Sequence, residues 1–134
     1  MGFFLRRFRR LVGAAAVVFG LVGCESPSEP VICTTIAVQA ITLTVVDGTS
    51  GQRVCDATVT AVDGSFSQVL PPFPGSAPDC TYSGPTERAG TYELRVSRAG
   101  YQPAIERNVR VTADQCHVMP VRLTVTLNRT SQAP

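Results

Sequence analysis

Residues 91–97 read TYELRVS, and apolar side chains alternate with polar ones along the whole stretch. This period of two is typical of a β-strand, in which successive side chains point to opposite faces of a sheet. We therefore expect Tyr92, Leu94 and Val96 to point into a core. The same alternation recurs in residues 118–127, which read VMPVRLTVTL. Two clear strands in the last third of the chain thus favour an all-β fold.

Earlier parts of the chain show the same pattern, interrupted by turns that contain Gly or Asp. The sequence predicts strands at residues 35–46, 54–62, 81–83 and 105–112, with a connection at residues 85–89. About seven short strands, with a turn every 8–12 residues, are typical of an immunoglobulin-like β-sandwich. The predicted fold class is therefore all-β, a sandwich of about seven strands.

One segment, residues 67–79, breaks the pattern because it contains four prolines and a glycine. Proline donates no ladder hydrogen bond, so the segment cannot be a central strand. We expect a long loop there, and long loops in compact domains are often functional. Phe73 lies in the middle of this loop and is a candidate binding residue. The alternative is an ordered connection that Cys80 fastens to the domain.

The first 23 residues, 1–23, are typical of a secretory signal peptide. Four arginines fall within residues 1–10, and residues 11–22 form an apolar run that is shorter than the roughly 20 residues of a membrane-spanning helix. We expect this leader to form a signal helix and to be removed. Eight arginines then face ten carboxylates, and the formal charge falls from +2 to −2. This balance gives no electrostatic reason to expect a nucleic acid partner.

A short motif at the end of the leader, Leu21-Val22-Gly23-Cys24, resembles the lipobox of bacterial lipoproteins. The resemblance implies cleavage before Cys24, acylation of that cysteine with lipid such as palmitate, and a tether over residues 24–34. Acyl chains, at roughly 0.8 kcal/mol per buried CH₂, hold a protein at a membrane without a spanning helix. Glu25 resembles the signal for sorting to the bacterial outer membrane of the cell envelope. The alternatives are an ordinary signal peptide with an incidental cysteine, or a short membrane anchor.

Four cysteines remain once Cys24 is set aside: Cys33, Cys55, Cys80 and Cys116. An even number in a small exported domain indicates disulfides, for which three pairings are possible. The absence of close pairs such as Cys-x-x-Cys argues against a metal site. The strand map favours Cys55–Cys80, which flank the proline-rich loop with Cys55 facing inward. It also favours Cys33–Cys116, since these residues precede the first and last strands and would meet if the two strands ran in parallel.

Three stretches together resemble the carboxypeptidase regulatory-like domain family. They are residues 41–64, ITLTVVDGTSGQRVCDATVTAVDG, then residues 90–96, GTYELRV, and residues 99–101, AGY. The resemblance covers residues 41–127 and implies a seven-stranded transthyretin-like sandwich over residues 35–128, followed by a tail at 129–134. The four cysteines are additions to the family's pattern. Because the shared motifs are structural, they support the fold more than any activity.

The sequence carries no set of residues that predicts catalysis, a metal site or a cofactor. Its one histidine, His117, follows Cys116, whereas zinc peptidase chemistry requires several His and Glu ligands. Asp47, Asp63 and Asp114 lie in turns, where we interpret them as caps of backbone N–H groups rather than calcium ligands. We therefore expect a protein that is not an enzyme.

Two groups of residues are candidates for binding. A basic face for an acidic sugar or a phospholipid headgroup would comprise Arg95, Arg98, Arg107 and Arg110. Its alternative is a solvated face balanced by Glu93 and Glu106. The aromatic residues Phe66, Phe73 and Tyr82 bracket the proline-rich loop and could stack on sugars or simply close the core.

We expect a structural or protein-interaction module that docks to another envelope protein through a sheet edge or the 67–79 loop. The alternative is a carbohydrate-binding module, which requires exposed aromatic side chains on one face.

Overall fold

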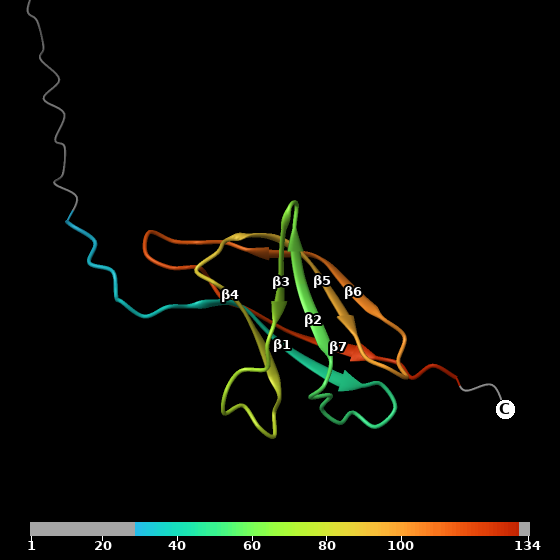
Figure 1. Ribbon diagram of the computed structural model, residues 1–134. Coiled ribbons are helices and arrows are strands. Elements are labelled where there is room, and N and C mark those ends of the chain that lie inside the picture. The colour runs from blue at the N-terminus through green and yellow to red at the C-terminus, as the bar shows by residue number, and fades with distance from the viewer. Residues whose placement is uncertain (1–28, 132–134) are drawn as a thin grey trace, which may run out of the picture. The chain divides into compact units, whose positions relative to one another are not determined.

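The computed structural model describes residues 29–131, and all of their regular structure is β-strand (Figure 1). The expected signal helix, Cys24 and the last three residues of the tail lie outside the described residues. The strands are β1 (Gln39–Asp47), β2 (Thr58–Asp63), β3 (Phe66–Leu70), β4 (Thr81–Thr86), β5 (Gly90–Ser97), β6 (Ala104–Val111) and β7 (Val121–Leu127). The expected all-β class is thereby confirmed.

The strands form two sheets, one with the order β4-β1-β7 and the other with the order β3-β2-β5-β6. β1 is the centre of the first sheet and runs antiparallel to β4 but parallel to β7. The parallel register places Ile41 opposite Val121 and Asp47 opposite Leu127. The starts of these two strands therefore meet, as the predicted Cys33–Cys116 pairing required.

A single apolar core draws residues from both sheets. Its largest fully buried side chains are Tyr82, Tyr92, Ile41, Leu43, Leu70, Leu94, Leu127, Val45, Val59, Val96 and Val125. On β5 and most of β1 these positions alternate with half-buried or exposed ones, because successive side chains of a strand point to opposite faces. β4 differs, since four of its consecutive residues are buried. The residues predicted to face inward on residues 91–97, including Leu94 at 0% exposure, are all in this core.

The loop in the proline-rich segment is shorter than the predicted loop over residues 67–79. Residues Phe66–Leu70 form β3, an edge strand that pairs antiparallel with β2 and places Val59 opposite Leu70. The prediction of a loop over residues 67–79 was therefore wrong for its first four residues, which contain no proline themselves. β4 likewise continues through Gly84 and Pro85, where a connection was expected. An edge strand tolerates proline because it has hydrogen-bonding partners on one side only.

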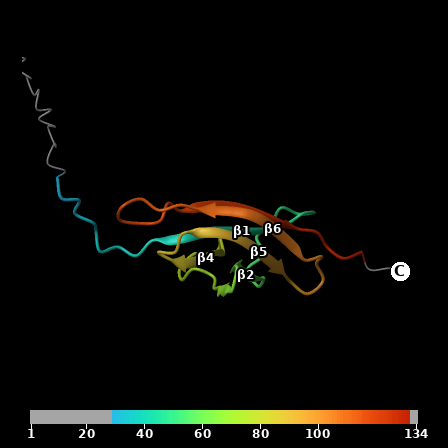
Figure 2. The same ribbon diagram turned by 90° about the horizontal axis from the view of Figure 1, so that it is seen from above.

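Three predicted strands begin later in the structure, and one of them is β2, which starts at Thr58 rather than at residue 54. β1 starts at Gln39 rather than at residue 35, and β7 starts at Val121 rather than at residue 118. Figures 1 and 2 show segment 31–38 and the loop between β6 and β7 at the same end of the domain, away from the end of β7. Within residues 29–131, no helix has the length and apolarity that a membrane span requires.

Candidate functional site

Both predicted disulfides are present. Cys33 is bonded to Cys116 and Cys55 to Cys80, with Cα–Cα distances of 5.2 and 5.1 Å. Cys55 is exposed, so its expected inward orientation was wrong. The reason is that β2 begins only at Thr58, which leaves Cys55 in the loop before the alternation starts.

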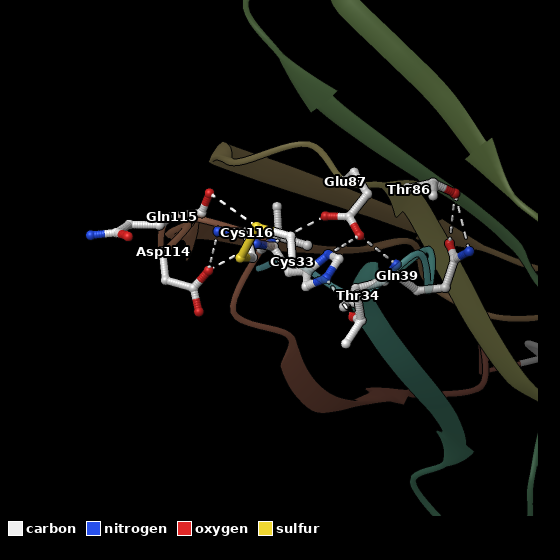
Figure 3. Close-up of polar contacts among 11 residues, drawn as sticks. Cys33, Thr34, Gln39, Thr86, Glu87, Asp114, Gln115 and Cys116 are labelled. Atoms are coloured by element: carbon white, nitrogen blue, oxygen red, sulfur yellow. Dashed lines mark hydrogen bonds and ion pairs between the residues drawn. A yellow bond between two sulfur atoms is a disulfide. The ribbon is translucent and has the colours of Figure 1, made fainter. Parts of the chain in front are cut away.

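The Cys33–Cys116 bond lies beside a cluster of polar side chains, which we call the junction cluster: Thr34, Glu87 and His117 (Figure 3). Thr34 Oγ1 lies 2.9 Å from His117 Nε2, and His117 Nδ1 lies 2.8 Å from Glu87 Oε1. The three residues come from the chain before β1, the turn between β4 and β5, and the loop between β6 and β7. The disulfide holds the first and third of these segments together, because Thr34 and His117 each follow a bonded cysteine.

The carboxylate of Glu87 is fixed by backbone donors as well as by the histidine. Its Oε1 accepts a hydrogen bond from the Val38 amide at 2.8 Å, and its Oε2 accepts one from the Val118 amide at 3.2 Å. The Val38 hydrogen bond, followed by the one from His117, lowers the pKa of Glu87 below its usual value. The charged carboxylate therefore connects three segments of the chain.

Asp114 organises the histidine side of the same cluster. Its Oδ1 accepts hydrogen bonds from the amides of Cys116 at 2.7 Å and His117 at 2.8 Å. The His117 amide is the first cause, and the Cys116 amide the second, of a lowered pKa at Asp114. The predicted role of Asp114 as a turn cap is confirmed.

A groove of about 480 Å³ opens beside the junction cluster. Its walls combine apolar residues with polar ones. The apolar residues are Ile36, Ala37, Ala89, Ala113 and Val118, and the polar ones include Thr35, Asp114 and Gln115 beside the junction cluster.

The Thr34 hydroxyl, the His117 imidazole and the Glu87 carboxylate follow one another in the same order as the groups of a catalytic triad, in which a general base activates a nucleophile. No sequence pattern pointed to a nucleophile for His117, and the structure places the Thr34 hydroxyl within hydrogen-bond reach of it. Neither Thr34 nor Glu87 was singled out from the sequence. The sequence did contain one signal that Thr34 and His117 lie close together, because each of them directly follows a cysteine of the predicted pair Cys33–Cys116.

The four candidate arginines are largely engaged by carboxylates. Glu93 binds Arg95 through Oε1 at 2.8 Å and Arg107 through Oε2 at 2.5 Å, and the Arg95 hydrogen bond lowers the pKa of Glu93. Arg98 pairs with Asp56 at 2.7 Å. Arg110 lies on β6 opposite Thr91 of β5 and is exposed. Glu93 therefore neutralises one of the two arginine charges that its carboxylate holds.

The three aromatic residues around the proline-rich loop differ sharply in exposure. Tyr82 is fully buried; its hydroxyl donates to the Val54 carbonyl and accepts from the Ala57 amide, both at 2.9 Å. Phe66 is half-buried, with the guanidinium of Arg88 4.0 Å above its ring. Phe73 is 50% exposed.

Phe73 borders a shallow trough of about 250 Å³ on the outer face of the three-stranded sheet. The other residues around it are Gln39, Thr42, Thr81, Ser83 and Arg122. Thr42 lies between Ser83 and Arg122 on adjacent strands, so hydroxyl groups form the floor. The amide of Phe73 donates to the Thr81 carbonyl at 2.6 Å, which fixes the loop against β4.

The other two turn aspartates behave differently from each other. Asp47 is 3% exposed; its Oδ1 caps the amides of Thr49 and Ser50 at 2.8 and 2.9 Å, as predicted. Its Oδ2 also accepts from the Tyr101 hydroxyl and from Arg129 Nε. Asp63 instead binds Arg88 at 2.7 Å, so its predicted role as a backbone cap was wrong.

The chain matches no protein-family model and no curated protein. Within residues 29–131, no three side chains of His, Cys, Asp or Glu gather as they would around a metal ion. The interpretation of the site therefore depends on its geometry.

Proposed function

We propose that this protein is a lipoprotein of the bacterial outer membrane whose folded domain is a non-catalytic interaction module outside the cytoplasm. The observation that carries the proposal is the complete pairing of Cys33 with Cys116 and of Cys55 with Cys80. Disulfides of this kind persist in oxidising compartments. Cys24, in its lipobox-like sequence, is then the one cysteine left for a lipid.

The proposed fold is a transthyretin-like sandwich of the carboxypeptidase regulatory-like kind. Two sheets that share one apolar core support this assignment, as does the parallel pairing of β1 with β7.

The proposed role of the junction cluster is mechanical rather than catalytic. The disulfide, the Thr34–His117 contact and the Val38 amide held by Glu87 fasten the chain before β1 to the domain. The contacts of Glu87 with His117 and with the Val118 amide fasten the loop between β6 and β7. A fluorophosphonate probe tests this assignment, because such probes label activated hydroxyl groups. We expect no label on Thr34, and labelling that His117→Ala abolishes would show that the cluster is catalytic.

The proposed partner is another envelope protein, bound through the loop that carries Phe73. This loop is fastened by Cys55–Cys80 and presents its aromatic ring half-exposed, so little conformational entropy is lost on binding. A photo-crosslinking benzoylphenylalanine at Phe73 in intact cells should yield one stoichiometric protein adduct. The matched control places the same residue at Ile105, which is 47% exposed on the other sheet.

Lipidation is tested in the same cells by labelling with a fatty acid analogue. We expect label in the wild-type chain and none in Cys24→Ser. Equal labelling of both proteins would refute the anchor, and an adduct at Ile105 as abundant as that at Phe73 would refute the partner site.

A glycan is the second candidate ligand, favoured by the trough beside Phe73. An aromatic ring can stack on the apolar face of a sugar, and the guanidinium of Arg122 suits the carboxylate of a uronic acid. Arg122 forms no ion pair with any carboxylate of residues 29–131. If this candidate is right, titration with an oligouronate should perturb the amide NMR signals of Thr42 and Ser83. Phe73→Ala should abolish the effect, whereas Val69→Ala should not.

A further inference from the structure

Most of the large exposed apolar side chains belong to two segments that the Cys33–Cys116 disulfide joins. Four of them form what we call the apolar end: Val31, Ile32, Ile36 and Met119, exposed by 59%, 91%, 69% and 51%. Only three other large apolar side chains in residues 29–131 are similarly exposed, and these are Val69, Phe73 and Ile105. Exposed apolar side chains that lie singly need no explanation, but a group at one end marks an interaction surface.

The apolar end is assembled by covalent and hydrogen bonds rather than by chance proximity. The Cys33–Cys116 disulfide connects the segment that carries Ile32 and Ile36 to the loop between β6 and β7. That loop is closed by the Met119 amide, which donates to the Thr112 carbonyl at 2.8 Å. Figures 1 and 2 both place the two segments at the same end. Ile36 also lines the groove beside the junction cluster, which extends the same surface.

The tether between the proposed anchor at Cys24 and the apolar end is short, so an anchored domain holds this surface near the membrane. Val31 lies seven positions after Cys24, and at roughly 3.3–3.6 Å per position this stretch reaches at most about 25 Å. The apolar end is the part of the described domain that follows this tether directly.

The charges near the apolar end specify the kind of surface that fits it. Segments 31–38 and 112–119 contain no arginine or lysine, whereas Asp114 is acidic. Attraction to anionic lipids requires basic residues, so it does not operate here. The partner that fits is therefore a zwitterionic lipid surface contacted through apolar side chains.

We propose that the apolar end inserts into the lipid interface next to the anchor, and that this contact orients the domain on the membrane. The inference rests on the proposed lipid anchor at Cys24 and adds a second, non-covalent contact to it. The junction cluster and the disulfide make the contact rigid. The starts of β1 and β7 then face the bilayer, and the loop that carries Phe73 is held in a fixed orientation relative to it.

The absence of tryptophan from the chain allows a direct test. Ile36→Trp and Met119→Trp each introduce a single fluorescent probe at the apolar end, and Ile105→Trp is the matched control. Each full-length lipidated protein is reconstituted into phosphatidylcholine vesicles whose acyl chains carry bromine, a quencher of tryptophan fluorescence. We expect loss of fluorescence and a blue-shifted emission at positions 36 and 119, and neither at position 105. Raising the salt concentration should leave the quenching unchanged.

Flotation of the vesicles tests the lipid anchor at Cys24 separately from the insertion of the apolar end. Protein that floats but shows equal fluorescence at all three positions would overturn the insertion of the apolar end and leave the anchor intact. Protein that does not float would overturn the anchor, and with it the inference. Ile32→Trp, in extended chain outside every strand, provides a probe that cannot disturb the sheets, and we expect it to be quenched as well.

Discussion

At the scale of single residues, Asp47 connects three distant parts of the chain. Its carboxylate caps a local turn and also holds Tyr101 and Arg129, which are 54 and 82 positions away. The hydrogen bond from Tyr101 is the main cause that lowers the pKa of Asp47 well below its usual range. The turn cap was predictable from the Asp-Gly signal. The other two contacts were not, because no local pattern specifies partners at such separations.

Asp47→Asn should lower the free energy of unfolding at neutral pH. The folded-state pKa of Asp47 lies below its value of about 3.8 in the unfolded chain, so its contribution is complete above that value and is lost as the pH falls toward the folded pKa. Urea denaturation between pH 7 and pH 2 is the measurement. The difference between wild type and variant should shrink steadily below about pH 4. A difference that stays constant would contradict this account, and Asp79→Asn, in the exposed loop, is the control.

Tyr82→Phe should destabilise the domain although it removes a single oxygen. The variant leaves the Val54 carbonyl and the Ala57 amide without their partner in the core, which costs about 1–3 kcal/mol for buried groups. Denaturant unfolding measures the loss. Phe73→Leu, at an exposed position, should cost much less, and an equal loss in both variants would refute the role of the hydroxyl.

At the scale of elements, strands with unbroken alternation were predictable and strands next to proline were not. The pattern of residues 91–97 predicted β5 and its buried face directly. β3 and the second half of β4 were missed because Pro71 and Pro85 suggested loops, although an edge strand can accommodate proline. Both disulfides were predicted from the strand map. Cys33 and Cys116 precede neighbouring parallel strands, whereas Cys55 and Cys80 flank the proline-rich loop.

The junction cluster could not be predicted as fully as the disulfide beside it. Glu87 lies in a connection whose path depends on the packing of two sheets, and 30 positions separate it from His117. Its partners also include the backbone amides of Val38 and Val118, which carry no sequence signal. The sequence implied only that Thr34 and His117 lie close to each other, because the cysteines that precede them form a predicted pair.

Glu87→Gln should loosen the junction cluster without unfolding the domain. The side chain keeps its size but loses the charge that strengthens hydrogen bonds from the Val38 and Val118 amides. Hydrogen exchange at these two amides should become faster, and exchange at Val54, remote from the cluster, should not change. Because the pKa of Glu87 is lowered in the folded state, acidification toward that pKa should bring the wild type closer to the variant. Unchanged exchange at both amides would contradict the proposed role of Glu87 in the junction cluster.

At the scale of the whole molecule, the two disulfides should differ in their effect on stability. The bonds join cysteines separated by 25 and 83 positions. Chain-entropy estimates for loops of these lengths are roughly 3.5 and roughly 4.5 kcal/mol. Replacing Cys33 and Cys116 by serine should therefore lower the free energy of unfolding more than replacing Cys55 and Cys80. Denaturant unfolding of the two double variants decides this, and the reverse order would show that strain or local packing outweighs loop closure.

The two bonds are nested, since Cys33–Cys116 encloses Cys55–Cys80 along the chain. Apart from Cys24, the first two cysteines of a chain that emerges from its N-terminus are Cys33 and Cys55, which are not a native pair. Cys80 and Cys116 follow, and joining each cysteine to its predecessor would give two wrong bonds. Correct oxidation therefore requires either that the sheets assemble before the thiols react or that early bonds are exchanged by thiolate attack, over seconds to hours. Maturation of this small domain thus depends on the timing of oxidation relative to the arrival of the last strand.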